Sequence, residues 1–233
     1  MKTHSRLIAL LVVVLTVSLF VGSCQKPDDH YAIGDFMVTF GVVGNNNDPV
    51  NSLNLIHLDN GDQFIPLSVN SDLNDFKAGE RVFINIAPLY DKEGSDKSKT
   101  IYGKINAIHE ILYKNIVPLT TSNNDSLGHY SIMVRDSWIS GDSILNIEFN
   151  YYTGGALHFI NLADNGEGNG KDKPYILEFR HNARNDHQYY KVSGYVSFKL
   201  NSLKIPGQNK ISLYIRYTDY EGRRIDLPHT YNY

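Results

Sequence analysis

The chain of 233 residues carries 22 Lys and Arg against 25 Asp and Glu, a net charge of −3 at pH 7. This mildly acidic balance, without a basic stripe, argues against nucleic acid as a partner, because phosphate binding needs clustered Lys and Arg. Cys24 is the sole cysteine, which excludes an intrachain disulfide framework. The 16 tyrosines suit strands, where the ring packs on a half-buried surface while the hydroxyl stays hydrated.

Residues 1–23 read as a signal peptide of the lipoprotein type. Lys2 and Arg6 precede an apolar run over residues 7–21, which is too short and wrongly flanked for a membrane-spanning helix. The run ends in the sequence VGSC over residues 21–24, which resembles a bacterial lipobox. Cleavage at this point would leave 210 residues with a net charge of −5.

Residues 24–31 are expected to form an acylated Cys24 and a short polar tether, since they include a proline and two acidic residues. The protein would then partner a membrane through its lipid anchor. We expect an outer-membrane location, on the periplasmic face or at the cell surface.

Residues 32–119 are predicted to form a small β-barrel domain. The sequence DFMVTFGVV over residues 35–43 places apolar residues at every second position, the period of a half-buried strand. Asn60-Gly61 between two apolar runs predicts a tight hairpin whose turn needs positive φ. Two further alternating runs bring the count to about five strands, which fits a small barrel.

Residues 120–129 are polar and rich in turn-forming residues, so we place a linker there. Beyond it, residues 130–233 alternate in short runs, of which ILNIEFNY over residues 144–151 is the clearest. Short strands separated by Gly- or Pro-bearing turns, without long helices, predict an antiparallel β-sandwich. The predicted fold class is therefore all-β, a small barrel followed by a sandwich.

Several of these segments resemble the NigD-like lipoproteins. They are Gly79-Glu80-Arg81-Val82, IHEILYKNIVPLT (108–120), LNIEFNY (145–151), HFINL (158–162), LEFRHNARND (177–186) and GYVSFKL (194–200). The resemblance covers nearly the whole chain after the signal peptide and implies an N-terminal OB-like barrel and a C-terminal β-sandwich. The family takes its name from a gene assigned to bacteriocin immunity, and the resemblance carries over no catalytic residue.

The segment LEFRHNARND ends in residue types that build catalytic and metal sites. By strand parity His181 shares a face with Leu177 and Phe179, so we expect a structural histidine that hydrogen-bonds loop backbone. Asn182 and Asp186 are natural turn makers through side-chain-to-backbone hydrogen bonds. The alternative is a metal or acid/base site, formed by His181, Asn182 and Asp186, at the end of the sandwich.

Two other groups of residues are candidate binding sites. Tyr151, Tyr152, Tyr189 and Tyr190, with Tyr214, Tyr217 and Tyr220, are candidates for an exposed aromatic platform for sugars. Because adjacent strand residues face opposite ways, one tyrosine of each adjacent pair should lie in the core. Asp164, Glu167 and Asp172 among glycines are weak candidates for a calcium site, for which a flexible hairpin loop is the favoured alternative.

The sequence contains no nucleophile elbow, Cys-His pair, phosphate loop or nucleotide fingerprint, so we expect no enzyme, no cofactor and no metal. The leading hypothesis is a non-catalytic binding module of the cell envelope, with immunity-like capture of a peptide. The alternatives are recognition of a glycan and a structural role as accessory to an outer-membrane complex.

Overall fold

The structure is a computed structural model that describes residues 31, 34–44, 55–69, 76–93, 98–141, 143–168 and 170–233. The expected signal peptide, Cys24 and nearly all of the tether lie outside the described residues, and they stay predictions. Within the described part of the chain, no helix is long and apolar enough to cross a membrane.

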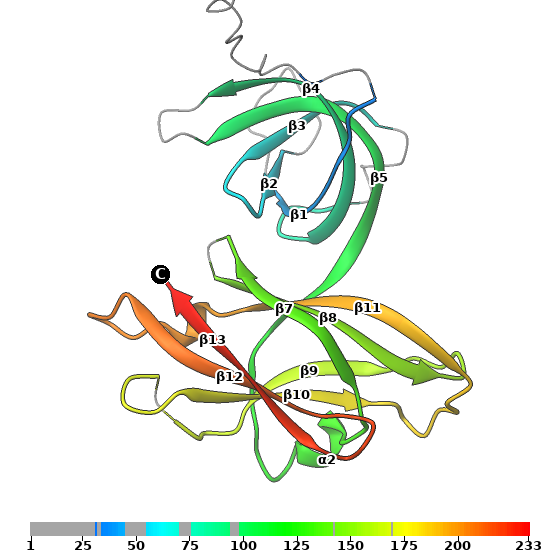
Figure 1. Ribbon diagram of the computed structural model, residues 1–233, viewed down its shortest axis with the longest axis vertical. Coiled ribbons are helices and arrows are strands. Elements are labelled where there is room, and N and C mark those ends of the chain that lie inside the picture. Colours follow the sequence, from blue (N-terminus) through cyan, green and yellow to red (C-terminus); the bar gives the residue numbers. More distant parts are fainter. Residues whose placement is uncertain are drawn as a thin grey trace, which may run out of the picture. The chain divides into compact units, whose positions relative to one another are not determined.

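The first five strands close into a barrel (Figure 1). They are β1 (Met37–Val43), β2 (Ile56–Leu58), β3 (Gln63–Val69), β4 (Arg81–Glu93) and β5 (Lys99–Asn115). Their order is β3-β2-β1-β4-β5, and a parallel pairing of β3 with β5 closes the ring. The strand count and the barrel expected from the sequence are thus confirmed.

Alternation along these strands supplies the barrel core. In β4, Val82, Ile84 and Ile86 are fully buried and pack in one cluster with residues of all the other barrel strands. The hairpin between β2 and β3 turns at Asn60-Gly61, where Gly61 has a φ of 92°, as predicted. A positive φ favours glycine because it has no Cβ to clash with the backbone.

The remaining strands form the β-sandwich. They are β6 (Val117–Pro118), β7 (Met133–Ser140), β8 (Ile144–Thr153), β9 (Phe159–Asp164), β10 (Tyr175–Asn182), β11 (Tyr190–Lys199), β12 (Lys210–Thr218) and β13 (Arg224–Asn232), with a short helix α2 (Asn124–Leu127) and a 3-10 turn η2 (Asn201–Leu203). One sheet has the order β5-β11-β8-β7 and continues into the barrel through β5, and the other has the order β13-β12-β10-β9-β6.

The sandwich is mixed in strand direction. The pairs β7–β8, β8–β11, β9–β10 and β12–β13 run antiparallel, as expected from the short strands. The pairs β10–β12, β5–β11 and β6–β9 run parallel, a detail that alternation within single strands does not encode. The parallel pairing of β10 with β12 brings their carboxyl ends to the same end of the sheet.

One apolar core fills the space between the two sheets. Leu145 and Ile147 of β8 meet Leu177 and Phe179 of β10 in a cluster whose buried members include Phe198, and all five are at most 2% exposed. The inward faces are those that the alternating runs predicted. This core fixes the ends of β8, β10 and β12, from which the candidate site is built.

A buried polar cluster joins the barrel strand β4 to the sandwich strands β8 and β11. The Arg81 side chain is fully buried and pairs with Asp59 through both terminal nitrogens. Arg81 also donates to Asn146 Oδ1 at 2.9 Å and to Ser197 Oγ at 3.2 Å. A buried charge is tolerated only when it is paired and hydrogen-bonded, and Arg81 meets both conditions.

The segment predicted as a linker contains the helix α2. The strand β6, which precedes it, pairs with β9 of the sandwich at Val117–Ala163 and Pro118–Asp164. The helix itself lies against β10, because Arg180 donates to Asn124 O at 3.1 Å and Asn182 Nδ2 donates to Ser126 O at 2.8 Å. The domain limits proposed at residues 119 and 130 stay predictions.

Candidate functional site

Three neighbouring cavities open at one end of the sandwich, and His129 and Tyr130 line all of them. Both residues lie in the segment between α2 and β7. The cavities have volumes of about 200, 770 and 400 Å³, and we name them the arginine, open and tyrosine pockets. Carboxyl-end residues of β8, β10 and β12 and the loops that follow them supply most of the other lining residues.

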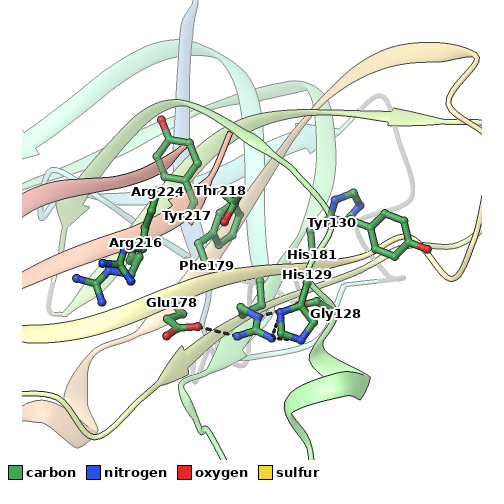
Figure 2. Close-up of a pocket in the computed structure, with 11 residues that line it drawn as sticks. Gly128, His129, Tyr130, Glu178, Phe179, His181, Arg216, Tyr217, Thr218 and Arg224 are labelled. Atoms are coloured by element: carbon green, nitrogen blue, oxygen red, sulfur yellow. Dashed lines mark hydrogen bonds and ion pairs between the residues drawn. The ribbon is translucent and has the colours of Figure 1, made fainter. Parts of the chain in front are cut away.

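The arginine pocket is lined by Gly128, His129, Tyr130, Glu178, Phe179, Arg180, His181, Arg216, Tyr217, Thr218 and Arg224 (Figure 2). The open pocket is lined by Asp125, Gly128, His129, Tyr130, Asn182, Arg184 and Asn185. The tyrosine pocket is lined by His129, Tyr130, Ser131, Tyr152, His181, Ala183, Gln188 and Tyr220.

Backbone contacts fix the shared segment against β10 and β12. Tyr130 N donates to His181 O at 3.0 Å, and Ile132 N donates to Thr218 O at 3.0 Å. Gly128 has a φ of 78°, and a Cβ there would lie 2.5 Å from His181 O and from Asn182 Cα. Glycine therefore allows the segment to approach β10 closely enough to place His129 and Tyr130 between the pockets.

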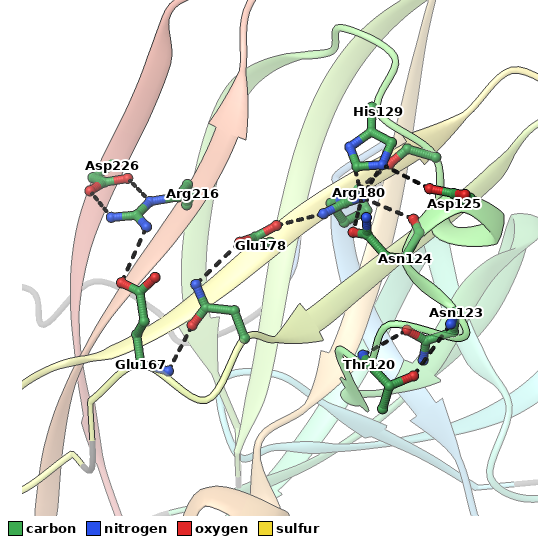
Figure 3. Close-up of polar contacts among 12 residues, drawn as sticks. Thr120, Asn123, Asn124, Asp125, His129, Glu167, Glu178, Arg180, Arg216 and Asp226 are labelled. Carbon is green, nitrogen blue, oxygen red and sulfur yellow. Dashed lines mark hydrogen bonds and ion pairs between the residues drawn. The ribbon is translucent and has the colours of Figure 1, made fainter.

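Arg180 holds the helix α2 and the shared segment in place (Figure 3). Its guanidinium donates to Gly128 O at 2.7 Å, to Asn124 O at 3.1 Å and to Glu178 Oε2 at 2.6 Å, and it lies 2.9 Å from His129 Nδ1. Arg180 is only 8% exposed although it faces away from the sandwich core. The residues of α2 and its C-terminal turn cover it, which strand parity alone does not reveal.

A ladder of charges crosses the outer face of the same sheet. Glu178 of β10 is the strand partner of Arg216 of β12, which forms bidentate hydrogen bonds with Asp226 at 2.7 and 2.8 Å. Arg216 also pairs with Glu167 at 3.5 Å. Figure 3 shows the ladder running from Asp226 to Arg180. These arginines are occupied by carboxylates of the protein itself, so they offer no strong site for an anion.

Two histidines and an aspartate form a buried chain behind the arginine and tyrosine pockets. His158 Nδ1 lies 2.8 Å from His181 Nε2, and His158 Nε2 lies 3.0 Å from Asp186 Oδ2. His181 Nδ1 lies 3.1 Å from Ser131 O, so the chain ends on the backbone of the shared segment. The His158 side chain is 2% exposed and His181 is 2% exposed.

Asp186 also fastens the turn that follows β8. Its Oδ2 accepts from Gly154 N at 2.6 Å, from Ala156 N at 3.2 Å and from Thr153 Oγ1 at 2.8 Å. Burial alone would raise the pKa of Asp186, but these donors and His158 hold it well below the ordinary value. The carboxylate therefore stays ionised.

Burial lowers the pKa of His181 from 6.5 to about 4, and the neighbouring His158 adds to this effect, while the hydrogen bond to Ser131 O opposes it. Among the described residues, neither His158 nor His181 contacts a hydroxyl or thiol that could act as a nucleophile. The hydrogen bonds of His158, His181 and Asp186 orient the loops around them, and these three residues form no nucleophile-base pair.

The tyrosine pocket is bounded by rings whose positions are fixed. The Tyr130 hydroxyl donates to Asn185 Oδ1 at 2.6 Å, and the Tyr220 hydroxyl donates to Asn150 O at 2.7 Å. Tyr152 and Tyr220 meet edge to face, with ring centroids 5.1 Å apart and planes at 67°. Burial and the nearby Tyr152 raise the pKa of Tyr220 to about 12, so its phenol is neutral.

Known proteins share the sequence pattern and the fold of this chain. The model of the NigD-like C-terminal beta sandwich domain matches residues 115–229. A solved structure of a protein from Parabacteroides distasonis, provisionally named toxin-related, is 31% identical, with 85% of this chain and 94% of that chain covered and a TM-score of 0.70. Residues 115–229 of the chain belong to the NigD-like family.

Two more distant structures share the fold of this NigD-like protein. A NigD-like immunity protein from Bacteroides caccae is 16% identical, with 87% of this chain and 99% of that chain covered and a TM-score of 0.61. A provisionally assigned lipoprotein from Bacteroides fragilis is 14% identical, with 85% and 98% covered and a TM-score of 0.57. A comparison with curated proteins finds no match.

The structure brings together His181 and Asp186 of the LEFRHNARND segment. As expected, His181 lies at the core edge and hydrogen-bonds loop backbone at Ser131. Asn182 makes the expected turn contact, because its Oδ1 accepts from Arg184 N at 2.9 Å. Arg184 and Asn185 then adopt φ values of 52° and 63°, and this reversal returns Asp186 to His158.

The four candidate tyrosines do not form one platform. Tyr151 packs against the sandwich core and His181, while Tyr152 lines the tyrosine pocket. Tyr189 and Tyr190 are 67% and 66% exposed, so the expectation that one of them lies in the core is wrong. Since β11 begins at Tyr190, Tyr189 lies outside the strand and the rule of alternation does not apply to it.

The weak calcium candidates serve other contacts. Asp164 Oδ1 accepts from Gly166 N at 2.9 Å, and Glu167 pairs with Arg216. Asp172 has interactions of its own. Over the described residues, no three His, Cys, Asp or Glu side chains are grouped so that they could hold a metal ion.

Sequence reasoning missed His158 and the pair His129-Tyr130. His158 was named only as part of the segment HFINL, without a role, and β9 begins at Phe159, so His158 belongs to the preceding turn. Its partners are 23 and 28 residues away, and no spacing rule links them. His129 is the last residue of the predicted linker and Tyr130 the first residue of the predicted sandwich, and the polar composition there gave no sign of pockets.

Proposed function

We propose that this NigD-like protein is a lipid-anchored, non-catalytic binding module of the cell envelope that captures a peptide at the end of its sandwich. The observation that carries the proposal is the set of three adjoining pockets around His129 and Tyr130. A peptide makes contacts over several residues, so adjoining pockets suit it better than a single closed cavity does.

The residue types at this end support recognition of a peptide. Tyrosine, asparagine, histidine, arginine and glycine on loops of a β-sandwich are the types that antibody loops use, because Tyr gives large contact areas and small polar residues adapt their hydrogen bonds. Tyr and Arg also dominate the binding energy of protein interfaces. The loops are held by a rigid scaffold, which limits the entropy lost on binding.

The names of two related structures agree with the proposed capture of a peptide toxin. One is called a NigD-like immunity protein and the other is provisionally named toxin-related. An immunity protein that acts by capture must bind its toxin tightly and need not change it chemically. The buried His181–His158–Asp186 chain, whose groups are occupied with loop contacts, is consistent with a non-catalytic role.

Two observations support the proposed lipid anchor: residues 21–24 resemble a lipobox, and a provisionally assigned lipoprotein shares the fold. Acylation of Cys24 would keep the module at the outer membrane, on the periplasmic face or at the cell surface. A peptide toxin that crosses the envelope would meet the module there before it reached its target.

The two rival functions have less support. A sugar platform needs coplanar exposed rings, whereas Tyr152 meets Tyr220 at 67° and Tyr189 meets Tyr190 at 78°. A purely structural accessory would present a flat apolar surface without pockets. Neither description fits the end of the sandwich.

The test is a purification of the intact lipoprotein from its native membrane, followed by mass spectrometry of what accompanies it. We expect one stoichiometric peptide or small protein with the wild type and with Tyr189→Ala, and its loss with Tyr130→Ala. Tyr189 is an apt control because it is an exposed tyrosine that lines none of the three pockets.

A gene deletion gives a second readout. Cells without the protein should become more sensitive to peptide toxins encoded beside it. Unchanged sensitivity, together with purification of the protein free of any peptide, would exclude capture of a peptide. Binding on a glycan array by the same preparation would favour the rival function.

A further inference from the structure

Most residues that line the tyrosine pocket carry no charge. Three of its residues are tyrosines, and Ser131, Ala183 and Gln188 carry no charge. His181 is neutral at neutral pH, because burial lowers its pKa to about 4. The tyrosine pocket has a volume of about 400 Å³, which falls within the usual range of ligand pockets, about 300–1,000 Å³.

The charge next to the pocket disfavours a charged ligand of either sign. His129 lies 2.9 Å from the guanidinium of Arg180, which would repel a cation. That guanidinium is already paired with Glu178 and bonded to Gly128, so it has little capacity left for an anion. A neutral group is the ligand that this lining accommodates at the lowest desolvation cost.

The angle between two walls suits a flat ring. Aromatic rings prefer offset stacked or edge-to-face contacts at centroid distances of about 4.5–7 Å. Tyr152 and Tyr220 meet at 67°, so a planar ring stacked on one of them turns its edge toward the other. Tyr130 has no ring contact with either of them but lines the same pocket, which leaves space for a third partner between them.

Three side chains of the pocket have polar atoms without a hydrogen-bond partner among the described residues. They are the hydroxyls of Ser131 and Tyr152 and the side-chain amide of Gln188, whereas the hydroxyls of Tyr130 and Tyr220 are both bonded. An amide and a hydroxyl beside an aromatic slot can bond the backbone of an anchoring residue or a phenol. A sugar usually needs several amide or carboxylate side chains around its ring, and among the residues that line this pocket Gln188 is the one such side chain.

We propose that the tyrosine pocket holds an uncharged aromatic side chain, of the tyrosine or tryptophan class, from the captured peptide. This inference rests on the proposed function, and it names the anchoring residue of the ligand. Tyr152 and Tyr220 form the walls of the slot, Tyr130 closes it, and Gln188 and the Tyr152 hydroxyl bond the polar atoms of the anchor. Buried aromatic anchors of this kind contribute most of the binding energy at peptide interfaces.

The test titrates the full mature chain with three small probes while backbone amide shifts are recorded. N-acetyltyrosinamide stands for the aromatic anchor, N-acetyllysinamide for a cationic side chain and methyl glucoside for a sugar. We expect saturable shifts at Tyr130, Ser131 and Gln188 with the tyrosine probe alone. Shifts there with the lysine or glucose probe, or none with the tyrosine probe, would overturn the inference.

Variants separate a pocket effect from a loss of fold. Tyr152→Ala should weaken binding of the tyrosine probe by about tenfold or more, since it removes one wall. Gln188→Ala, at an exposed position, should weaken it a few-fold through one lost hydrogen bond. Tyr190→Ala, an exposed tyrosine outside the pocket, should leave the affinity within about twofold of the wild type.

The inference and the proposed function can fail separately. A peptide that still accompanies Tyr152→Ala and Gln188→Ala from the membrane would sustain capture and refute the aromatic anchor in this pocket. Binding of the tyrosine probe without any captured peptide would leave an aromatic site and refute the peptide function.

Discussion

His158 Nδ1 and His181 Nε2 lie 2.8 Å apart, so a single proton joins two buried imidazole rings. The chain continues from these rings to Ser131 O on one side and to the ionised Asp186 on the other, and both of these groups only accept. The hydrogen-bonded chain thus ties the segment before β7, the turn before β9 and the turn after β10 to one another.

The stability of the protein should fall when the pH drops from 6.5 to 4. The folded protein keeps His181 unprotonated down to a pKa of about 4, whereas the unfolded chain takes up a proton near 6.5. In this window the unfolded state binds more protons, so the free energy of unfolding decreases as the pH falls. The loss from this residue is on the order of 3 kcal/mol at pH 4.

Urea unfolding at a series of pH values measures this effect. His181→Asn keeps a donor near Ser131 O but cannot titrate, so its curve should be flatter between pH 6.5 and 4. It should keep the smaller slope contributed by His229, whose pKa burial also lowers. An unchanged slope in His181→Asn would show that His181 does not carry the effect.

Asp186→Asn should loosen the turn after β8. The carboxylate oxygen Oδ2 accepts hydrogen bonds from Gly154 N, Ala156 N, Thr153 Oγ1 and His158 Nε2. A neutral amide in its place would accept weaker hydrogen bonds and would add two donors of its own. We expect faster amide hydrogen exchange at Gly154 and Ala156, measured by mass spectrometry or NMR.

The matched control is Asp226→Asn on the outer face of the sheet, where the side chain is 36% exposed. It should leave exchange in the turn at residues 154–156 unchanged. Equal effects of the two substitutions would mean that Asp186 does not hold the turn.

Arg81→Met should destabilise the protein strongly. It leaves Asp59 without its partner next to the buried Asn146 and Ser197, and removal of one member of a buried pair costs about 3–5 kcal/mol. Arg216→Met, which breaks pairs on the outer face of the sheet, should cost about 1 kcal/mol or less. Thermal unfolding of both variants checks the contrast, and a similar shift in melting temperature for the two would contradict it.

Gly128→Ala should displace the segment that carries His129 and Tyr130. The new Cβ would lie 2.5 Å from His181 O and from backbone atoms of Asn182, in addition to the strain of a positive φ. We expect a loss of about 2 kcal/mol or more and altered amide shifts around all three pockets.

Gly207→Ala separates the two causes. Gly207 also has a φ of 78°, but a Cβ there meets nothing within 4 Å. This control should therefore show the cost of the positive φ alone, about 1 kcal/mol. If the two variants lose the same stability, close packing of Gly128 against β10 has no role.

Local residue chemistry predicted the features that depend on near neighbours in the chain. Asn60-Gly61 predicted its hairpin, because the tight turn needs a positive φ that Gly61 supplies. Alternation placed Leu177, Phe179 and His181 on the core face of one strand, and the count of strands gave the barrel and the sandwich. Asn182 was assigned correctly to a turn, since its side chain bonds backbone two residues away.

The site depended on contacts between distant segments. Asn146 lies on the polar side of an alternating strand, yet it is 1% exposed because Arg81 of the barrel covers it. His158 meets Asp186 only because the reversal at Arg184 and Asn185 folds the chain back after β10. His129 and Tyr130 line pockets only because Gly128 lets their segment pack on that strand.

The sequence by itself thus determined the strands, their inward faces and the tight turns, because these follow from the period of the backbone and from the φ preference of single residues. The tertiary structure decided which polar groups are buried together and where cavities open. Those features depend on side chains from three or four elements that meet in space, and no spacing along the chain encodes such a meeting.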